Sequence, residues 1–254
     1  MKSSFFNEYP FYQKDFETLL ADAIGKIANK EKHFIVTANP EILMNAYRND
    51  RYRSALLSAN DIVADGIGVV WASKLLHTPS PAHIPGIDIM QQLINKASDK
   101  QFKVYMLGSK PESLENAVSN LKQSYPNLLI CGYHHGYFQD SEKILKKIKA
   151  AEPDIVFVAL GSPMQEQWIY ENFPFFDKGL FIGIGGSFDI LSGQVKRAPL
   201  SLRKAHLEWA YRLLIHPRRM NKAKNLFVFS ILILYSKLTS FLSLNKNSPS
   251  HSPD

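Results

Sequence analysis

The segment DIVFVALG (154–161) runs directly into SPMQEQWIYEN (162–172), and this succession decides the fold. The first part is an apolar run of strand length that ends in glycine, and the second has the pattern of a helix. A near-continuous apolar strand is typical of a parallel sheet that is covered on both faces. The segment therefore predicts one strand–turn–helix unit of such a sheet.

Five further apolar runs repeat this arrangement along the chain. They are HFIVT (33–37), DIVAD (61–65), KVYMLG (103–108), LLICGY (128–133) and LFIGIGG (180–186). Each is followed by a turn and then by a helical pattern. Strands that alternate with helices form parallel sheets. We therefore expect an α/β, Rossmann-like fold, with a mostly parallel sheet and helices on both of its faces.

The composition is that of an ordinary globular chain, with 254 residues of which 45% are hydrophobic. Its one cysteine, Cys131, cannot form an internal disulfide, which favours a cytosolic setting. The first twenty residues lack an apolar stretch followed by a small-residue cleavage site, so the sequence predicts no signal peptide.

The net charge of +7 is concentrated near the C-terminus. Residues 196–224 hold nine Lys or Arg and one acidic residue, whereas residues 1–195 are nearly neutral. A nucleic-acid-binding protein would show a broader basic surface, so we expect no nucleic-acid partner.

This charge pattern predicts three parts: a Rossmann-like core (1–195), a basic and apolar appendage (196–244) and a disordered polar tail (245–254). Lys237 and several serines make 225–244 a poor membrane span. A helix lying on an anionic membrane surface fits better. A true span and packing in a homo-oligomer are the alternatives.

Polar residues follow the first two strands at the edge where ligands bind in parallel sheets. Asp65 ends DIVAD and could act as a general base, or simply cap the next helix. Thr37 and Asn39 follow HFIV, where Asn39 also suits a helix N-cap. The repetition of such residues at several strand ends favours a site.

Glycine turns follow three other strands. Gly108-Ser109 and Gly161-Ser162 repeat one arrangement, and Gly183, Gly185 and Gly186 form a third turn. Backbone N–H groups at such turns bind phosphate, which predicts a nucleotide diphosphate site. The G-x-G-x-x-G and Walker A motifs are absent, which disfavours a dehydrogenase or an NTPase. No D-x-D pair follows a strand, and we expect no metal and no cofactor.

Segments spread over residues 33–219 resemble, in order, those of the WecG/TagA/CpsF family of bacterial glycosyltransferases. They are TANPEILMNAYRND, DIVADGIGVVWASKLL, IPGIDIM, YMLGSKPESLENAV, GYHHGYF, PDIVFVALGSPMQEQWI, GIGGSFDILSGQVKRAP and LEWAYRLLIHPRR. The resemblance implies metal-independent, inverting transfer from a UDP-sugar to a polyprenyl-diphosphate-linked sugar. It also implies a cytoplasmic protein that is peripheral on the inner face of the cell membrane.

The resemblance also assigns roles to residues. Asp65 matches the catalytic base, and Thr37 and Asn39 match a polar pair that holds the sugars. Gln167 and Asp189 match polar positions of the donor pocket, and the Gly-Ser turns line the nucleotide. Arg212, Arg218 and Arg219 match arginines that close over the diphosphate. His83 stands where many relatives have Arg, and a histidine is charged only part of the time near neutral pH.

Within the family, the closest likeness is to the enzymes of the teichoic-acid linkage unit. These transfer N-acetylmannosamine from UDP to undecaprenyl-diphosphate-linked N-acetylglucosamine. Transfer of another hexose, such as N-acetylmannosaminuronate or glucose, in capsule or exopolysaccharide assembly is the alternative. A non-catalytic module that binds nucleotide sugars is a further alternative, against which the acid at position 65 argues.

Overall fold

Six parallel strands form one sheet in the computed structural model, which describes residues 5–215 and 220–246. The strands are β1 (Lys32–Ala38), β2 (Asp61–Ala64), β3 (Lys103–Gly108), β4 (Leu129–His134), β5 (Ile155–Ala159) and β6 (Gly179–Gly183). Their order is β2-β1-β6-β5-β3-β4, and every adjacent pair is parallel. All six expected strands and the Rossmann-like α/β fold are confirmed.

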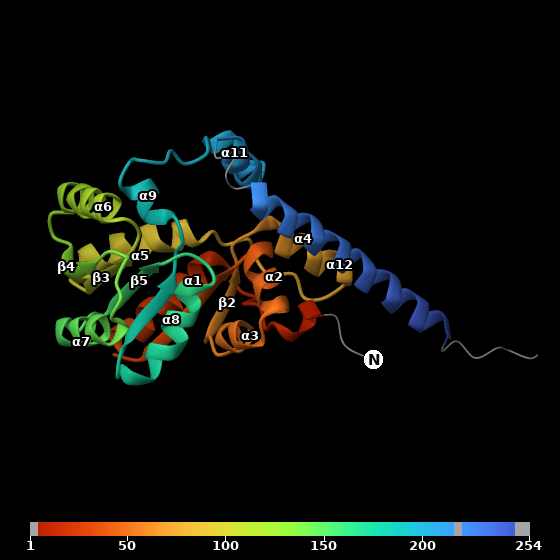
Figure 1. Cartoon of the computed structure of the whole chain (residues 1–254), viewed down its shortest axis with the longest axis horizontal. Helices are drawn as coiled ribbons and strands as arrows, with labels where there is room; N and C mark the ends of the chain where they lie inside the picture. Colours follow the sequence, from red (N-terminus) through yellow and green to blue (C-terminus); the bar gives the residue numbers. More distant parts are fainter. Residues whose placement is uncertain (1–4, 216–219, 247–254) are drawn as a thin grey trace, which may run out of the picture.

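Helices cover both faces of the sheet (Figure 1). They are α1 (Phe16–Ala28), α2 (Pro40–Arg48), α3 (Asp50–Leu57), α4 (Ile67–Leu76), α5 (Gly86–Lys100), α6 (Pro111–Ser124), α7 (Ser141–Ala151), α8 (Met164–Asn172), α9 (Ser187–Leu191), α10 (Leu200–Lys204), α11 (Glu208–Ile215) and α12 (Met220–Lys246), with short 3₁₀ helices η1 (Phe5–Glu8) and η2 (Phe173–Phe175).

Two apolar cores lie on the two faces, because successive side chains of a strand point to opposite sides. In β1, Phe34 and Val36 join the core that contains side chains of α2, α3, α4 and α8, and Ile35 joins the core that contains side chains of α1, α5 and α6. All three are at most 1% exposed. Burial on both faces explains why the strands are apolar throughout.

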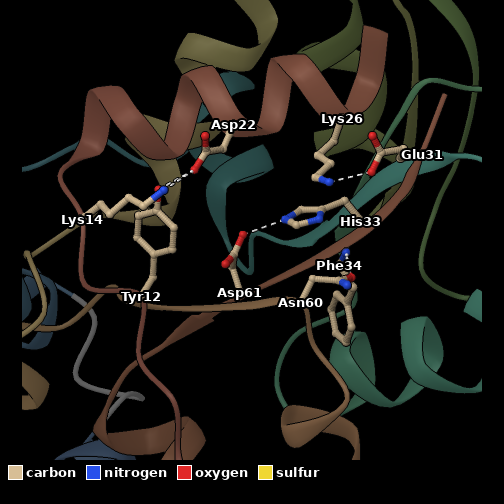
Figure 2. Close-up of polar contacts among 9 residues, drawn as sticks. All are labelled: Tyr12, Lys14, Asp22, Lys26, Glu31, His33, Phe34, Asn60 and Asp61. Carbon is tan, nitrogen blue, oxygen red and sulfur yellow. Dashed lines mark hydrogen bonds and ion pairs between the residues drawn. The ribbon is translucent and has the colours of Figure 1, made fainter. Parts of the chain in front are cut away.

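The amino ends of β1 and β2 carry a group of polar contacts (Figure 2). His33 Nε2 lies 2.7 Å from Asp61 Oδ2, and the N–H of Phe34 donates to Asn60 Oδ1 over 2.8 Å. These contacts tie the starts of two neighbouring strands together. They lie at the opposite end of the sheet from the carboxyl edge where the predicted site residues are found.

The C-terminal helices pack on the body of the protein at one end. Phe229 and Ile233 of α12 are 2% exposed and belong to the core that also contains side chains of η1, α2 and α4. Farther along, α12 leaves the body, as the blue helix of Figure 1 shows. Side chains of α12 thus belong to the same core as side chains of the body. The division of the chain into two parts at residue 195 rests on composition alone and stays a prediction. Residues 247–254 of the predicted tail lie outside the described residues.

Candidate active site

A cleft of about 930 Å³ opens at the carboxyl ends of β1 and β2. Four of the predicted site residues line it: Thr37, Asn39, Asp65 and His83. The appendage lines it from the other side, with residues of α10, α11 and α12. The cleft therefore lies between the sheet edge and the C-terminal helices, and both parts of the chain are needed to form it.

Asp65 follows the last residue of β2 and is fixed by three hydrogen bonds. Its N–H donates to the carbonyl of Ala38 over 2.8 Å, which extends the pairing with β1. Its Oδ1 accepts from the N–H of Gly86 over 2.6 Å, and its carbonyl lies 2.9 Å from His83 Nε2. The carboxylate is thus held at one place in the cleft, as positioned acid–base groups require.

The segment before α5 runs beside the end of β2, and this brings His83 and Gly86 to Asp65. Ile84 N–H donates to the Ala64 carbonyl over 2.8 Å, in an isolated parallel bridge. The His83 ring also lies 5.0 Å from that of His206, between α10 and α11. The pair of histidines joins the core to the appendage at the cleft. His206 was not singled out from the sequence.

Thr37 and Asn39 have structural partners in addition to their place in the cleft. Thr37 Oγ1 donates to the carbonyl of Gly183 over 2.9 Å, which ties the end of β1 to the turn after β6. Asn39 Oδ1 accepts from the N–H of Ile42 over 3.1 Å and caps α2, as its place before Pro40 predicts. A role of either residue in holding sugars stays a prediction.

Arg197 is a cleft residue that the sequence interpretation did not assign to the site. Its guanidinium forms two hydrogen bonds to the Asp88 carboxylate, of 2.6 and 3.0 Å, and Nε lies 3.7 Å from Glu208 Oε2. Burial lowers the pKa of Arg197, but the hydrogen bond and charge of Asp88, with the charge of Glu208, outweigh it and leave the pKa raised. Through these two contacts Arg197, which lies between α9 and α10, links Asp88 of α5 to Glu208 of α11. Both IPGID and VKRAP, which hold the two partners, were among the matching segments.

One wall of the cleft is apolar. Its lining includes Trp71 and Leu75 of α4 and Leu226 and Ile233 of α12. Trp71 is 59% exposed, which is unusual for so large an apolar side chain. The cleft therefore combines a fixed carboxylate with an apolar surface.

The glycine turns lie farther along the same edge, because β6, β5 and β3 follow β1 in the sheet. Ser109 Oγ donates to Asp189 Oδ1 over 2.9 Å, so the structure brings together two predicted donor-site residues that are far apart in sequence. Gly108 has a φ of +124°, and a side chain there would collide with Ala159. The first turn therefore requires glycine.

The turn after β6 is held by Gln165, and the predicted donor-pocket role of Gln167 stays a prediction. Gly185 N–H donates to Gln165 Oε1 over 3.0 Å, and the Gln165 side chain is buried. Gln167 lies two residues farther along α8 and is half-buried. Ile184 and Ser187, which flank Gly185 and Gly186, line the cleft. Gly161, at a φ of +78°, precedes Ser162 after β5.

The predicted arginines of the appendage are only partly described. Arg212 lies within α11, and its side chain is not among those described. Arg218 and Arg219 lie outside the described residues. Their predicted role in closing over a diphosphate stays a prediction.

The described residues contain no group of three or more His, Cys, Asp or Glu side chains that could hold a metal ion. Within residues 5–215 and 220–246, no helix has the length and hydropathy needed to cross a membrane.

Comparison with the sequences of known proteins places this chain in a family. The sequence model described as the glycosyl transferase WecG/TagA/CpsF family matches residues 5–242. A protein of Bacillus spizizenii named N-acetylglucosaminyldiphosphoundecaprenol N-acetyl-beta-D-mannosaminyltransferase is 44% identical over 189 residues, which is 74% of this chain and 74% of the relative.

Proteins with the same name from two other bacteria are also similar. That of Bacillus subtilis is 39% identical over 212 residues, covering 80% of this chain and 83% of the relative. That of Staphylococcus aureus is 40% identical over 205 residues, covering 80% of each. With a family match over nearly its whole length and relatives at this identity, the chain belongs to the WecG/TagA/CpsF family of glycosyl transferases.

Proposed function

We propose that this chain transfers N-acetylmannosamine from UDP-N-acetylmannosamine to undecaprenyl-diphosphate-linked N-acetylglucosamine, in synthesis of the teichoic acid linkage unit. The names of its relatives support the sugar and the acceptor. The observation that carries the proposal is the position of the Asp65 carboxylate. The Gly86 N–H holds it in a cleft that has an apolar wall.

In the proposed reaction, the acceptor hydroxyl attacks the anomeric carbon of the donor while Asp65 takes the hydroxyl proton. The bond from the anomeric carbon to the UDP oxygen breaks, and its electron pair leaves with UDP. A single displacement of this kind inverts the anomeric centre. General-base assistance contributes a factor of about 10²–10⁴ to such a step.

Negative charge that develops on the leaving diphosphate needs stabilisation. The turns that contain Gly108, Gly161 and Gly185 are suited to this, because backbone N–H groups at helix starts bind phosphate. The Gly185 N–H itself donates to Gln165, so in the third turn the neighbouring N–H groups would serve. Arg212, Arg218 and Arg219 add positive charge in the family assignment. Preorganised donors and cations of this kind stabilise a leaving group without a metal ion. Full activity in excess EDTA is therefore the expected result.

The acceptor lipid suits the apolar wall of the cleft, where Trp71 and Leu75 face α12. The described part of α12 also carries exposed apolar side chains, among them Phe227, Tyr235 and Leu238. Together with the basic residues of 196–224, they support peripheral docking on the anionic inner face of the cell membrane. Packing of this surface against a second copy of the chain, in a homo-oligomer, is the alternative.

The test is a donor panel with the purified full chain. UDP-N-acetylmannosamine, UDP-N-acetylglucosamine, UDP-glucose and UDP-N-acetylmannosaminuronate are each offered with a short-chain lipid-diphosphate-N-acetylglucosamine acceptor. We expect product only with UDP-N-acetylmannosamine, and a β linkage by NMR. Preferred transfer from another donor would support the runner-up, a different hexosyltransferase. Absence of UDP release with every donor would instead support a binding module.

A further inference from the structure

A buried acid, Glu166, lies beneath two of the glycine turns, and no step of the proposed reaction uses it. It is in the first turn of α8 and is 0% exposed. Its neighbours Gln165 and Tyr52 are 2% and 0% exposed. A buried carboxylate is costly unless hydrogen bonds satisfy it, so its partners indicate what it does.

The first partner connects Glu166 to the turn after β6. Gly185 N–H can only donate, so the atom of Gln165 that faces it at 3.0 Å must be the amide oxygen. The amide nitrogen of Gln165 therefore faces Glu166, and it donates to Oε1 over 2.7 Å. Gly185 is thus linked to the carboxylate through one side chain.

The second partner connects Glu166 to the turn after β5. Tyr52 donates its hydroxyl proton to Glu166 Oε2 over 2.8 Å. The Tyr52 oxygen lies 2.9 Å from Ser162 Oγ, and since its own proton is used, Ser162 donates to it. Asn45 Nδ2 completes the chain by donating to Ser162 Oγ over 3.2 Å. Hydrogen bonds from both turns therefore converge on one carboxylate.

Gly183 allows this network to lie directly against β6. A Cβ at Gly183 would be 2.7 Å from Gln165 Nε2 and 3.1 Å from Glu166 Oε1. From the other side, Thr37 Oγ1 donates to the Gly183 carbonyl. The turn is thus held between a cleft residue and the buried network.

We propose that Glu166 is a positioning residue for the donor: its carboxylate fixes the turn at Gly185, through Gln165, relative to the turn at Ser162, through Tyr52. This inference rests on the proposed function, because it takes the two turns as the support of the UDP diphosphate. Glu166 acts through its neighbours and does not touch the substrate.

Two substitutions of Glu166 separate this role from simple space filling. In Glu166→Gln, the amide oxygen still accepts from Gln165 and the amide nitrogen can donate to Tyr52, so both links remain. Glu166→Met has a similar unbranched shape but leaves Tyr52 and Gln165 without an acceptor. The readouts are the Kd for UDP by calorimetry, and the donor KM and kcat in the transfer assay.

For Glu166→Met we expect a UDP Kd and donor KM raised about tenfold or more, which is the worth of one or two hydrogen bonds, with kcat little changed. Glu166→Gln should stay near wild type. Gln165→Met removes both hydrogen bonds of the Gln165 amide, and so the link from Glu166 to Gly185, but leaves the link to Tyr52. It should raise the UDP Kd in the same way and serves if Glu166→Met does not fold. The control is Glu171→Gln on the same helix, whose carboxylate forms an exposed ion pair with Arg51.

Equal effects of Gln and Met at position 166, or an unchanged UDP Kd in Gln165→Met, would overturn the positioning role. A wild-type protein that does not bind UDP would overturn it as well. If the wild type binds UDP and the variants behave as expected, but no sugar is transferred from UDP-N-acetylmannosamine, then the positioning role stands and the proposed function fails.

Discussion

The Asp65 carboxylate accepts a hydrogen bond of 2.6 Å from the backbone N–H of Gly86, the first residue of α5. The first N–H groups of a helix have no partner within the helix, so a side chain from another element can satisfy one of them. The contact fixes the start of α5 against the end of β2. It also fixes the orientation of the proposed base.

Asp65→Asn should lower turnover by about 10²–10⁴, because the amide keeps the shape of the carboxylate but cannot take the proton. The amide oxygen can still accept from Gly86, so the Kd for UDP should not change. Asp61→Asn is the matched control, since Asp61 begins the strand that Asp65 follows but pairs with His33 at the other end of the sheet (Figure 2). Near-normal turnover of Asp65→Asn would refute the assignment.

Phe229→Ala should lower the free energy of unfolding by about 3–5 kcal/mol, as is usual for a buried aromatic side chain. Phe229 is 2% exposed and its ring contacts those of Phe5 and Phe6. Phe227→Ala in the same helix should change stability by less than about 0.5 kcal/mol, because Phe227 is 68% exposed. Urea denaturation of both variants measures the difference. Equal losses would mean that α12 does not pack as described.

Binding to vesicles that contain anionic lipid should weaken as salt is raised, because headgroup attraction is screened within about 10 Å at 0.1 M salt. Replacing Phe227 and Tyr235 by Ser should weaken it further, since both side chains are exposed and apolar or amphipathic. Cosedimentation with vesicles measures both effects, and neutral vesicles are the control. Binding that ignores both salt and these substitutions would argue against docking through α12.

His83→Arg tests the departure from the family pattern. When His83 Nε2 donates to the Asp65 carbonyl, the neutral ring has only a lone pair at Nδ1 to offer to a phosphate. If His83 binds the acceptor diphosphate, His83→Arg should lower the acceptor KM, because guanidinium carries a permanent charge and several N–H donors. An unchanged acceptor KM would show that His83 is no phosphate contact.

Glu166 should make the protein less stable as the pH rises. Burial raises the pKa of Glu166 from 4.5 to about 7, and the charge of Glu41 adds to this rise. The hydrogen bonds from Gln165 and Tyr52 lower the pKa but do not cancel the effect of burial. Between these two values the folded protein holds a proton that the unfolded chain has lost, so the free energy of unfolding falls as pH rises through about 7. Glu166→Gln should remove this part of the slope.

The contribution of Glu166 to the pH dependence of stability is measured by denaturing the wild type and Glu166→Gln at about pH 5 and about pH 8. The contributions of other titrating groups cancel in the difference between the two proteins. The wild type should lose more stability than the variant over this interval. Equal losses in the two proteins would mean that Glu166 titrates as an exposed acid does.

The sequence alone determined the sheet. The six apolar runs became β1 to β6, because strands that are buried on both faces must be apolar at every position. It also determined that Asp65, Thr37 and Asn39 would lie near one another, since the carboxyl ends of parallel strands share one edge. Helices α1, α3 and α5 do not directly follow a strand, so the repeated strand–turn–helix pattern did not predict them.

Only the tertiary structure decided which side chains meet across long separations. The pairs Asp65–Gly86, Asp88–Arg197 and Ser109–Asp189 join elements whose spacing in sequence carries no information about contact. The same holds for Gln165 and Glu166, which read as ordinary residues of a helix start but lie buried under the glycine turns. Local pattern fixes the period of a strand or helix, whereas such contacts depend on strand order and on how the helices pack, and these are set by the whole chain.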